Sequence, residues 1–482
     1  MIHLLEKFIE LIVHLLEALF KLLAELFEMA VDRFSKKNKT YDAKFIRGSD
    51  LLSNRNIGFC LTGDTSLSVK NSYQNALVIG GTGVGKSSVV LIPSLYSMTS
   101  SFVIHDPSGE LFQKTAGHLH ARGYAVKVLN FSKPSVSAGY NPLARAHTSS
   151  EIQKVASMLV ENSLGGTGKA DPFWNTQATA LLSMLITILK TQAPEYQNLY
   201  NVRQLLNQLG GDLKNPNAVN PVDTLFAKHA DPILFNEYKS FIAYEEKVIS
   251  SVIATCKAAL QLFSDAAVAA VTSFDTLPMD EWRTGRVALF IQNSIADQRY
   301  YSALTSIFFE QFFAYVLSRF PDNSEQDIFF LVDEASSLKF PTLPLAVANV
   351  RKHRAGIMLL VQDFNQLTRN YGKHDAEAIR SNCFTKMYFT GQGLETTKEL
   401  EQILGRFEYK DKDGKTVVRP LMTSDEIRIM NIKLALLLIG HHPPIKAKLK
   451  PYYEINEYRR WSEFPPPVIT VSTPTQPAVL PL

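Results

Sequence analysis

The residues best suited to chemistry form one glycine-rich segment, Gly80-Gly81-Thr82-Gly83-Val84-Gly85-Lys86-Ser87. It matches the pattern GxxxxGK[ST], which is typical of a phosphate-binding loop, at every fixed position. Glycines allow backbone N–H groups to converge on phosphate oxygens, the lysine reaches the β- and γ-phosphates, and the serine hydroxyl ligates Mg²⁺. We therefore predict ATP and Mg²⁺ as cofactors, with contacts from Gly80, Gly81, Thr82, Gly83, Gly85, Lys86, Ser87 and Ser88.

A pair of acids stands where such a site needs a second metal-binding carboxylate. Asp333 and Glu334 directly follow five apolar residues, 328–332, which are typical of a buried strand. We predict that Asp333 holds Mg²⁺ through water, beside Ser87, and that Glu334 polarises the attacking water. An acidic pair at a strand end also suits a solvated turn, so the catalytic interpretation depends on its combination with the glycine-rich segment.

Gln362 is a further candidate catalytic residue. It directly follows the apolar run 357–361 and should emerge at the carboxyl end of that strand, where ligands bind in open α/β sheets. A glutamine there can sense a γ-phosphate or orient water. It can equally be a polar strand cap, and the sequence leaves both interpretations open.

A parallel sheet is needed to bring these residues together. Apolar, β-type runs alternate with helical stretches, which predicts an α/β fold whose parallel sheet is covered by helices on both faces. Between 148 and 275, amphipathic and Ala-rich helical spacing predominates, so we predict an inserted all-α domain. The predicted strands are 76–79, 102–105, 125–129, 287–292, 328–332, 357–361 and 384–389.

The predicted organisation has five segments. An oligomerising amphipathic helix occupies 1–34, the nucleotide-binding domain occupies 35–147 and 276–460, and the all-α domain occupies 148–275. Residues 461–482, rich in proline, are predicted to form an extended, disordered tail.

The composition of the chain is that of a globular protein. Its 50 Lys and Arg against 46 Asp and Glu leave a net charge of only +4, which does not by itself identify a nucleic-acid binder. Three cysteines far apart exclude a disulfide framework and favour a reducing compartment. No signal peptide is visible.

Residues 1–34 are the compositional exception. Charged or histidine residues interrupt every apolar run after at most three residues, so a membrane span is not expected. Polar residues recur every seven positions, at Lys7, His14, Lys21 and Glu28, which favours a left-handed coiled coil in a high-order bundle. The alternatives are a helix docked on its own domain and an interfacial anchor. The regularity is also typical of an appended or engineered segment.

From about residue 70 to 455, an ordered series of segments resembles the type IV coupling proteins, the TraG/TraD group of conjugative and type IV secretion ATPases. Residues 103–111 are similar to that family's DPKGEL-type segment, and Tyr140-Asn141-Pro142-Leu143 to its NPL segment. The other matching segments are Phe173-Trp174, Asp333-Glu334, Gln362 with Gln366-Leu367, Tyr371-Gly372, Arg419-Pro420-Leu421, Glu426-Ile427, Pro443-Pro444-Ile445 and Tyr452-Tyr453.

The resemblance implies a RecA-like P-loop NTPase core, a homo-hexameric ring with ATP between subunits, and a catalytic arginine that acts on the neighbouring subunit. Arg351 is assigned that role, with Arg354 in reserve; a basic surface helix is the alternative. As partners, the resemblance implies single-stranded DNA, a relaxase with accessory proteins, and the type IV secretion channel.

The sequence departs from the family in two places. Ser108 stands where a lysine is usual, which puts any phosphate or DNA contact there in doubt. The family normally begins with transmembrane helices that anchor it in the bacterial inner membrane, facing the cytoplasm. This chain has the charged helix instead, and we expect it to be cytoplasmic as given.

DNA-contacting residues are not located by the sequence. The basic clusters Arg351–Arg354 and 446–450 are candidates, although charge runs are usually solvated faces. His441-His442 has no further ligands at a metal spacing, so we expect it to be structural.

The leading hypothesis is an ATP-driven coupling protein that links a relaxase–DNA complex to the secretion channel. The alternatives are another ring DNA translocase, such as a partition or packaging motor, and a non-catalytic docking scaffold that binds nucleotide.

Overall fold

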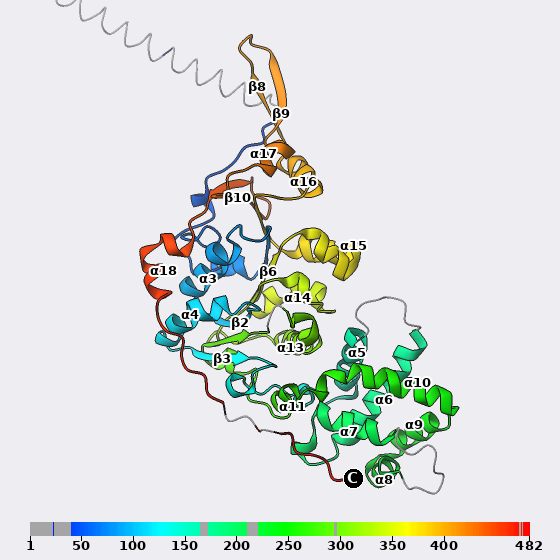
Figure 1. The fold of residues 1–482 in the computed structure, drawn as a ribbon. Coiled ribbons are helices and arrows are strands. Elements are labelled where there is room, and N and C mark those ends of the chain that lie inside the picture. Colours follow the sequence, from blue (N-terminus) through cyan, green and yellow to red (C-terminus); the bar gives the residue numbers. More distant parts are fainter. Residues whose placement is uncertain are drawn as a thin grey trace, which may run out of the picture. The chain divides into compact units, whose positions relative to one another are not determined.

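The computed structural model describes Leu23 and residues 40–163, 172–209, 220–293, 296–471, 474 and 476–482. Apart from Leu23, the predicted helix at 1–34 lies outside the described residues. The chain divides into two compact units, Met1–Ile46 with Gly393–Met430, and Arg47–Gln392 with Asn431–Leu482. Both units are drawn in Figure 1.

The larger unit is built on a nine-stranded sheet in the described residues, with strand order β11-β10-β7-β1-β6-β5-β2-β4-β3. Strands β1 to β7 run parallel, and β1, β2, β4, β5 and β6 are buried throughout. Strands covered on both faces become continuous apolar runs, which is why all seven were predicted. Their bounds are β1 Ala76–Ile79, β2 Ser101–His105, β3 Ala125–Leu129, β4 Val287–Ile291, β5 Ile328–Val332, β6 Ala355–Val361 and β7 Thr385–Phe389.

Two antiparallel strands that the sequence analysis missed, β10 (Leu434–Ile439) and β11 (Ile445–Lys448), extend one edge of the sheet. Along β11 the side chains alternate, with Ile445 and Ala447 buried and Lys446 and Lys448 exposed. Lysines on the outer face of an edge strand discourage pairing with another sheet edge. That placement gives the 446–450 cluster a structural explanation.

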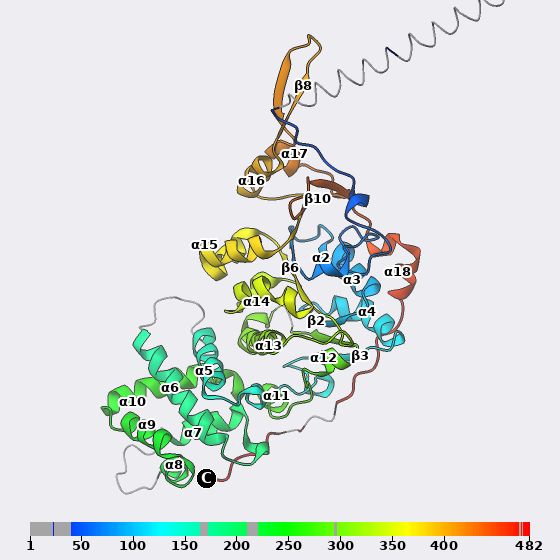
Figure 2. The same cartoon turned by 180° about the vertical axis from the view of Figure 1, so that it is seen from behind.

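Helices cover both faces of the sheet (Figures 1 and 2). Helices α3, α4 and α18 lie on one face, and α13, α14 and α15 lie on the other. The short helices α2 and α12 lie in connections. The bounds are α2 Val69–Ser72, α3 Ile92–Ser97, α4 Glu110–Ala121, α12 Glu281–Thr284, α13 Gln298–Ser318, α14 Leu343–Asn349, α15 Phe364–Asn382 and α18 Asn456–Trp461.

Between β3 and β4 the described residues contain helices and no strand. Local signals explain several of their starts: Asn220 and Asp231 accept hydrogen bonds from first-turn N–H groups, and prolines occupy the first helical positions. The helices are α5 Ser149–Ser163, α6 Pro172–Leu189, α7 Leu199–Leu209, α8 Pro221–His229, α9 Pro232–Ile242, α10 Glu246–Ala259 and α11 Ala266–Val271. The α/β fold with an all-α insertion is confirmed, whereas the five segment boundaries stay predictions.

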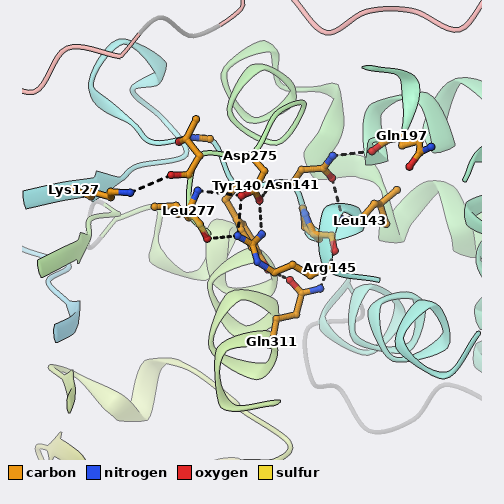
Figure 3. Close-up of polar contacts among 12 residues, drawn as sticks. Lys127, Tyr140, Asn141, Leu143, Arg145, Gln197, Asp275, Leu277 and Gln311 are labelled. Atoms are coloured by element: carbon orange, nitrogen blue, oxygen red, sulfur yellow. Dashed lines mark hydrogen bonds and ion pairs between the residues drawn. The ribbon is translucent and has the colours of Figure 1, made fainter. Parts of the chain in front are cut away.

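The two chain crossings between the sheet and this helical region are joined by a buried ion pair (Figure 3). Both terminal nitrogens of Arg145 donate to the carboxylate of Asp275, one of them at 2.8 Å, and the guanidinium also donates to the carbonyl of Leu277. The two side chains are only 16% and 19% exposed. The same carboxylate accepts the backbone N–H of Asn141 at 3.2 Å. Asp275 therefore connects the chain segment that enters the helical region, at Asn141 and Arg145, with the segment that leaves it.

This connection between the sheet and the helical region, the neck, is formed by Arg145, Asp275 and the NPL segment, residues 140–143 (Figure 3). The Tyr140 hydroxyl donates to Gln311 on α13 at 2.7 Å, and the Gln311 amide donates to the carbonyl of Pro142 at 2.8 Å. The side chain of Asn141 caps its own turn and donates to the carbonyl of Gln197 at 2.7 Å. These contacts give the segment a structural role between the sheet and the helices.

The smaller unit contains a two-stranded hairpin that was not predicted. The hairpin strands are β8 Arg406–Lys410 and β9 Thr416–Pro420. The helices α16 Leu394–Leu404 and α17 Ser424–Arg428 precede and follow them. The hairpin turns at Gly414, whose φ of 76° favours glycine. No residue of its two strands is buried, and polar or charged residues interrupt both, so they lack the apolar run by which the buried strands were recognised.

The prediction of a disordered tail differs from the described structure. Trp461 stacks on His118 of α4 with ring centroids 4.2 Å apart, and the backbone at Phe464 and Pro465 lies against Gly117. Farther on, Leu480 is buried. Trp461, Phe464, Pro465 and Leu480 are thus held by specific contacts that composition does not reveal.

Among helices in the described ranges, none combines the length and the apolar character needed to cross a bilayer.

The neck ion pair leads to a stability prediction. We expect Arg145→Ala to lower the free energy of unfolding by about 2 kcal/mol, because it leaves the mostly buried Asp275 carboxylate without its charge partner. Chemical denaturation measures the change.

Arg419→Ala is the matched control, because the Arg419–Glu426 pair is 40% and 46% exposed and should contribute much less to stability than the Arg145–Asp275 pair. Equal losses from the two substitutions would contradict the role of the neck.

Candidate active site

The glycine-rich loop leaves the carboxyl end of β1, between β6 and β7. The N–H of Gly80 donates to the carbonyl of Val361 at 3.1 Å, and a Cβ at Gly80 would lie 2.8 Å from the Cβ of Phe389. Gly83 and Gly85 have φ values of 78° and 94°, which L-residues with side chains rarely adopt. These three glycines are therefore required by the loop conformation itself.

Lys86 is buried and folds back over the loop. Its ammonium group donates to the carbonyls of Gly80 at 2.5 Å and Gly81 at 3.0 Å. Burial lowers the pKa of Lys86, while the nearby charges of Glu334 and Asp333 act in the opposite direction. The ammonium group thus sits among the loop backbone and the two acids.

The helix after the loop begins with a wide turn. Ser87–Leu91 is π-helical, and the N–H of Ile92 donates to the carbonyl of Ser87, five residues earlier. Pro93 follows and lacks the N–H that a regular helix would use, so it interrupts the ordinary ladder. The Ser88 hydroxyl donates to the carbonyl of Gly85 at 3.1 Å and thereby stabilises the loop rather than extending from it.

Ser87 and Asp333, which lie 246 residues apart in the chain, meet at the site. The Ser87 hydroxyl donates to the Asp333 carboxylate at 3.3 Å. Burial and the charge of Glu334 raise the pKa of Asp333 to about 6, and Lys86 opposes that rise. A hydroxyl and a carboxylate side by side are hard oxygen donors of the kind that Mg²⁺ prefers, so the two predicted metal residues fit that ion.

Glu334 and Gln362 also lie together. The Gln362 amide nitrogen is 3.2 and 3.0 Å from the two carboxylate oxygens of Glu334. Glu334 has a φ of 52° and a ψ of 45°, a left-handed conformation that costs a residue with a side chain roughly 1–3 kcal/mol. Strained backbone of this kind persists where the surrounding structure holds it in place. Glu334 and Gln362 extend from the ends of β5 and β6 into one site.

Two buried residues beside the site, Asp106 and His105, were not among the predicted site residues. The carboxylate of Asp106 accepts the backbone N–H groups of Leu111 at 3.2 Å and Phe112 at 2.8 Å, and so caps α4. Burial raises its pKa to about 6, although those two N–H groups lower it. The aspartate of the DPKGEL-like segment is thus a helix cap next to the site.

His105 supports Asp333 from behind. Its Nδ1 donates to the Asp333 carbonyl at 2.6 Å, while its Nε2 is buried without a hydrogen-bond partner among the described residues. Burial lowers the pKa of His105 to about 4, so the ring is neutral at neutral pH. A histidine inside an apolar strand gives little warning of such a role in the sequence.

Arg351 lies far from the loop of its own chain. It is exposed just before β6, where it donates to the Gln74 side chain at 3.1 Å, whereas Gln362 follows the opposite end of that strand. Seven residues of strand span roughly 23 Å. The structure therefore brings together Lys86, Ser87, Asp333, Glu334 and Gln362, and it leaves Arg351 outside that group.

Arg354, the reserve candidate, is engaged in structure. Its φ is 48°, its guanidinium pairs with Asp327 at 2.8 Å, and it donates to the carbonyls of Asp322 and Glu325. His441 and His442 stack on each other, and the described residues contain no cluster of three or more metal-ligating side chains.

A phosphate loop at the switch of a parallel sheet, an acidic pair two strands away and a helical insertion define a RecA-like P-loop NTPase fold. The family model described as "Type IV secretory system Conjugative DNA transfer" matches residues 23–472. This chain belongs to that family.

Curated relatives agree with the assignment. "Protein VirD4" from Agrobacterium fabrum is 22% identical over 424 residues, covering 81% of this chain and 60% of the relative. "Conjugal transfer protein TraG" from Escherichia coli is 25% identical over 364 residues, covering 70% and 55%. The chain thus spans little more than half the length of these relatives.

Solved structures agree on the fold. "Bacterial conjugative coupling protein TrwBdeltaN70" in complex with sulphate has a TM-score of 0.66 at 18% identity, covering 85% of this chain and 93% of that one. "Plasmid coupling protein TrwB in complex with ADP and Mg2+" has a TM-score of 0.64 at 18% identity.

The cap formed by Asp106 predicts a loss of stability on substitution. We expect Asp106→Ala to lower the free energy of unfolding by about 2 kcal/mol, because two buried first-turn N–H groups of α4 lose their acceptor. Denaturant-induced unfolding followed by circular dichroism measures the effect.

Asp363→Ala serves as the control, since Asp363 caps the exposed start of α15 through a single N–H, of Asn365, and should cost about 1 kcal/mol or less. The interpretation would be wrong if Asp106→Ala were the milder of the two.

Proposed function

We propose that this chain is an ATP-driven coupling protein that links a relaxase–DNA complex to a type IV secretion channel and helps to move single-stranded DNA or protein. The proposal rests on the convergence of five side chains at the carboxyl ends of the parallel strands: Lys86, Ser87, Asp333, Glu334 and Gln362. The family and its named relatives supply the biological setting.

In the proposed reaction, Ser87 and Asp333 would hold Mg²⁺, which would supply positive charge to offset the charge on the phosphates. Lys86 exchanges the loop carbonyls for the β- and γ-phosphate oxygens, for which its position in the loop is suited. One Gln362 amide contacts both carboxylate oxygens of Glu334 and restricts the orientation of that carboxylate, which would accept a proton from the attacking water. Gln362 then acts by positioning Glu334. Loss of the Gln362–Glu334 hydrogen bond would couple the position of Glu334 to the presence or absence of the γ-phosphate.

The first experiment tests hydrolysis. We expect Lys86→Ala to reduce DNA-stimulated ATP hydrolysis by about a hundredfold or more, because the γ-phosphate loses its ammonium partner. Lys70→Ala, which removes an exposed lysine of α2, should retain full activity.

Phosphate release is measured on ring-forming protein with and without single-stranded DNA. Hydrolysis that survives in Lys86→Ala, or an unsubstituted chain with no hydrolysis at all, would refute the motor and favour a docking scaffold.

The second experiment concerns a hexameric ring with ATP between subunits. The exposure of Arg351 and its distance from the loop of its own chain are compatible with action on a neighbour. Arg351→Ala alone should lower hydrolysis by about 10³-fold, because an arginine spreads its planar charge over the γ-phosphate in the transition state.

Mixing Arg351→Ala subunits with Lys86→Ala subunits should restore part of the activity, since each supplies what the other lacks. Lys352→Ala, an adjacent exposed cation, is the control and should remain active. Mixed rings that stay inactive would exclude Arg351 as the residue that acts in trans.

A further inference from the structure

The side chain of Asn201 is an unusual polar group in the helical region. It lies on α7 and is 0% exposed. One hydrogen of its amide is used within the region, in a 3.0 Å hydrogen bond to the carbonyl of Tyr196. The other amide hydrogen and the side-chain oxygen are both directed at residues near the end of the described chain, 277 and 279 positions later in sequence.

These two groups hold the backbone of an extended segment. The Asn201 amide nitrogen donates to the carbonyl of Ala478 at 2.8 Å, and its oxygen accepts the N–H of Leu480 at 3.0 Å. In an extended chain the carbonyl of residue i and the N–H of residue i+2 point to the same side. The planar carboxamide therefore pairs with this segment as a residue of a neighbouring strand would.

The side chains of the segment divide into one buried anchor and exposed neighbours. Leu480 is 7% exposed, whereas Val479 is 57% and Leu482 is 47% exposed. The segment is therefore recognised through one apolar side chain, that of Leu480, and through two hydrogen bonds of its main chain. Figures 1 and 2 both place this end of the chain beside α7 and α8.

The segment is suited to this mode of binding before it docks. Pro477 has a fixed φ and Pro481 biases Leu480 towards extended backbone, so less conformational entropy is lost on binding. Neither proline has an N–H to leave unpaired. The stretch Gln476-Pro477-Ala478-Val479-Leu480-Pro481-Leu482 also carries no charged side chain to desolvate.

If the segment left, the side-chain oxygen and one amide hydrogen of Asn201 would lose their protein partners. An apolar side chain at this position could pack against the segment but could not make either main-chain hydrogen bond. The Asn201 side chain is thus placed to bind the main chain of an extended peptide.

We propose that the helical region carries a binding site for an extended peptide, built around the Asn201 side chain and the pocket of Leu480, with residues 476–482 of this chain as its resident ligand. The ligand class is a neutral, proline-flanked segment in which an apolar residue follows a small residue by two positions. A partner protein that supplies such a segment would compete with the resident one.

The resident segment also connects two parts of the larger unit. Upstream of it, the N–H of Val471 donates to the carbonyl of Ser135 at 3.3 Å, next to the sheet. Docking at Asn201 therefore adds a further link between the helical region and the nucleotide-binding core, in addition to the ion pair of Arg145 and Asp275 and the packing of α5 against α13. Displacement would remove that link and leave the neck in place.

The test uses a fluorescent peptide of sequence Gln-Pro-Ala-Val-Leu-Pro-Leu and the full chain. A Leu480→Asp chain should release its own segment, because a carboxylate cannot be buried in the apolar pocket without a partner. We expect this chain to bind the peptide at least about tenfold more tightly than the unsubstituted chain, whose tethered segment competes at an effective concentration of about a millimolar.

Val479→Asp is the matched control, because it places the same charge on the adjacent exposed residue and should leave the resident segment docked. The peptide with N-methyl leucine at the position of Leu480 should bind the Leu480→Asp chain about tenfold more weakly, since only the N–H donor is removed. Equal binding by the two aspartate variants, equal binding of the methylated peptide, or no binding to Leu480→Asp would each overturn the proposal.

A measurement on the unsubstituted chain protects the test from misfolded variants. Amide hydrogen exchange at Leu480 should be at least about tenfold slower than at Val479, which makes no such contact in the described structure. Similar exchange at the two amides would also overturn the proposal.

Discussion

The parallel pairing of β1, β6 and β5 is the constraint on which the candidate active site depends. Its register aligns Ile79 with Val361, and Val332 with Leu359, so these strands deliver the next residues of the chain to one edge of the sheet. The phosphate loop, Gln362 and the Asp333-Glu334 pair all begin at that edge. Without this pairing, the hydrogen bond between Ser87 and Asp333 would have to close a loop of more than 200 residues unaided.

Charge is concentrated at this edge at a cost in stability. Burial disfavours the charged forms of Asp333, Asp106 and Lys86 alike, and Glu334 adds backbone strain. Specific contacts partly offset these costs: Asp106 accepts a helix N–H, the Ser87 hydroxyl donates to the Asp333 carboxylate, and Lys86 donates to the Gly80 carbonyl. Gln362 holds the Glu334 carboxylate. The acids are thereby fixed in place before any ligand arrives.

The helical insertion depends on a second set of tertiary contacts. Two chain crossings would by themselves form a loose connection, and the bidentate Arg145–Asp275 pair with the Tyr140–Gln311 hydrogen bond joins them to each other and to α13. The segment at Asn201 adds a connection from a part of the chain that is remote in sequence. These polar contacts add to the packing of α5 against α13 in holding the helices on the core.

The sequence by itself determined the phosphate loop, the seven parallel strands and the acidic pair, because each is a local pattern: glycines where φ is positive or a Cβ would clash, and apolar runs where a strand is buried on both faces. Only the tertiary structure decided which polar residues act together. His105 lies in a predicted apolar strand, and nothing in the sequence indicated its contact with Asp333. Lys446 and Lys448, in a cluster that was one candidate DNA contact, lie on the exposed side of the edge strand β11. The tail that was predicted to be disordered contains a segment held by Asn201. For His105 and for the tail, the deciding partner lies more than 200 residues away in the chain. A hydrogen bond between such distant residues leaves no periodicity or composition that a sequence can display.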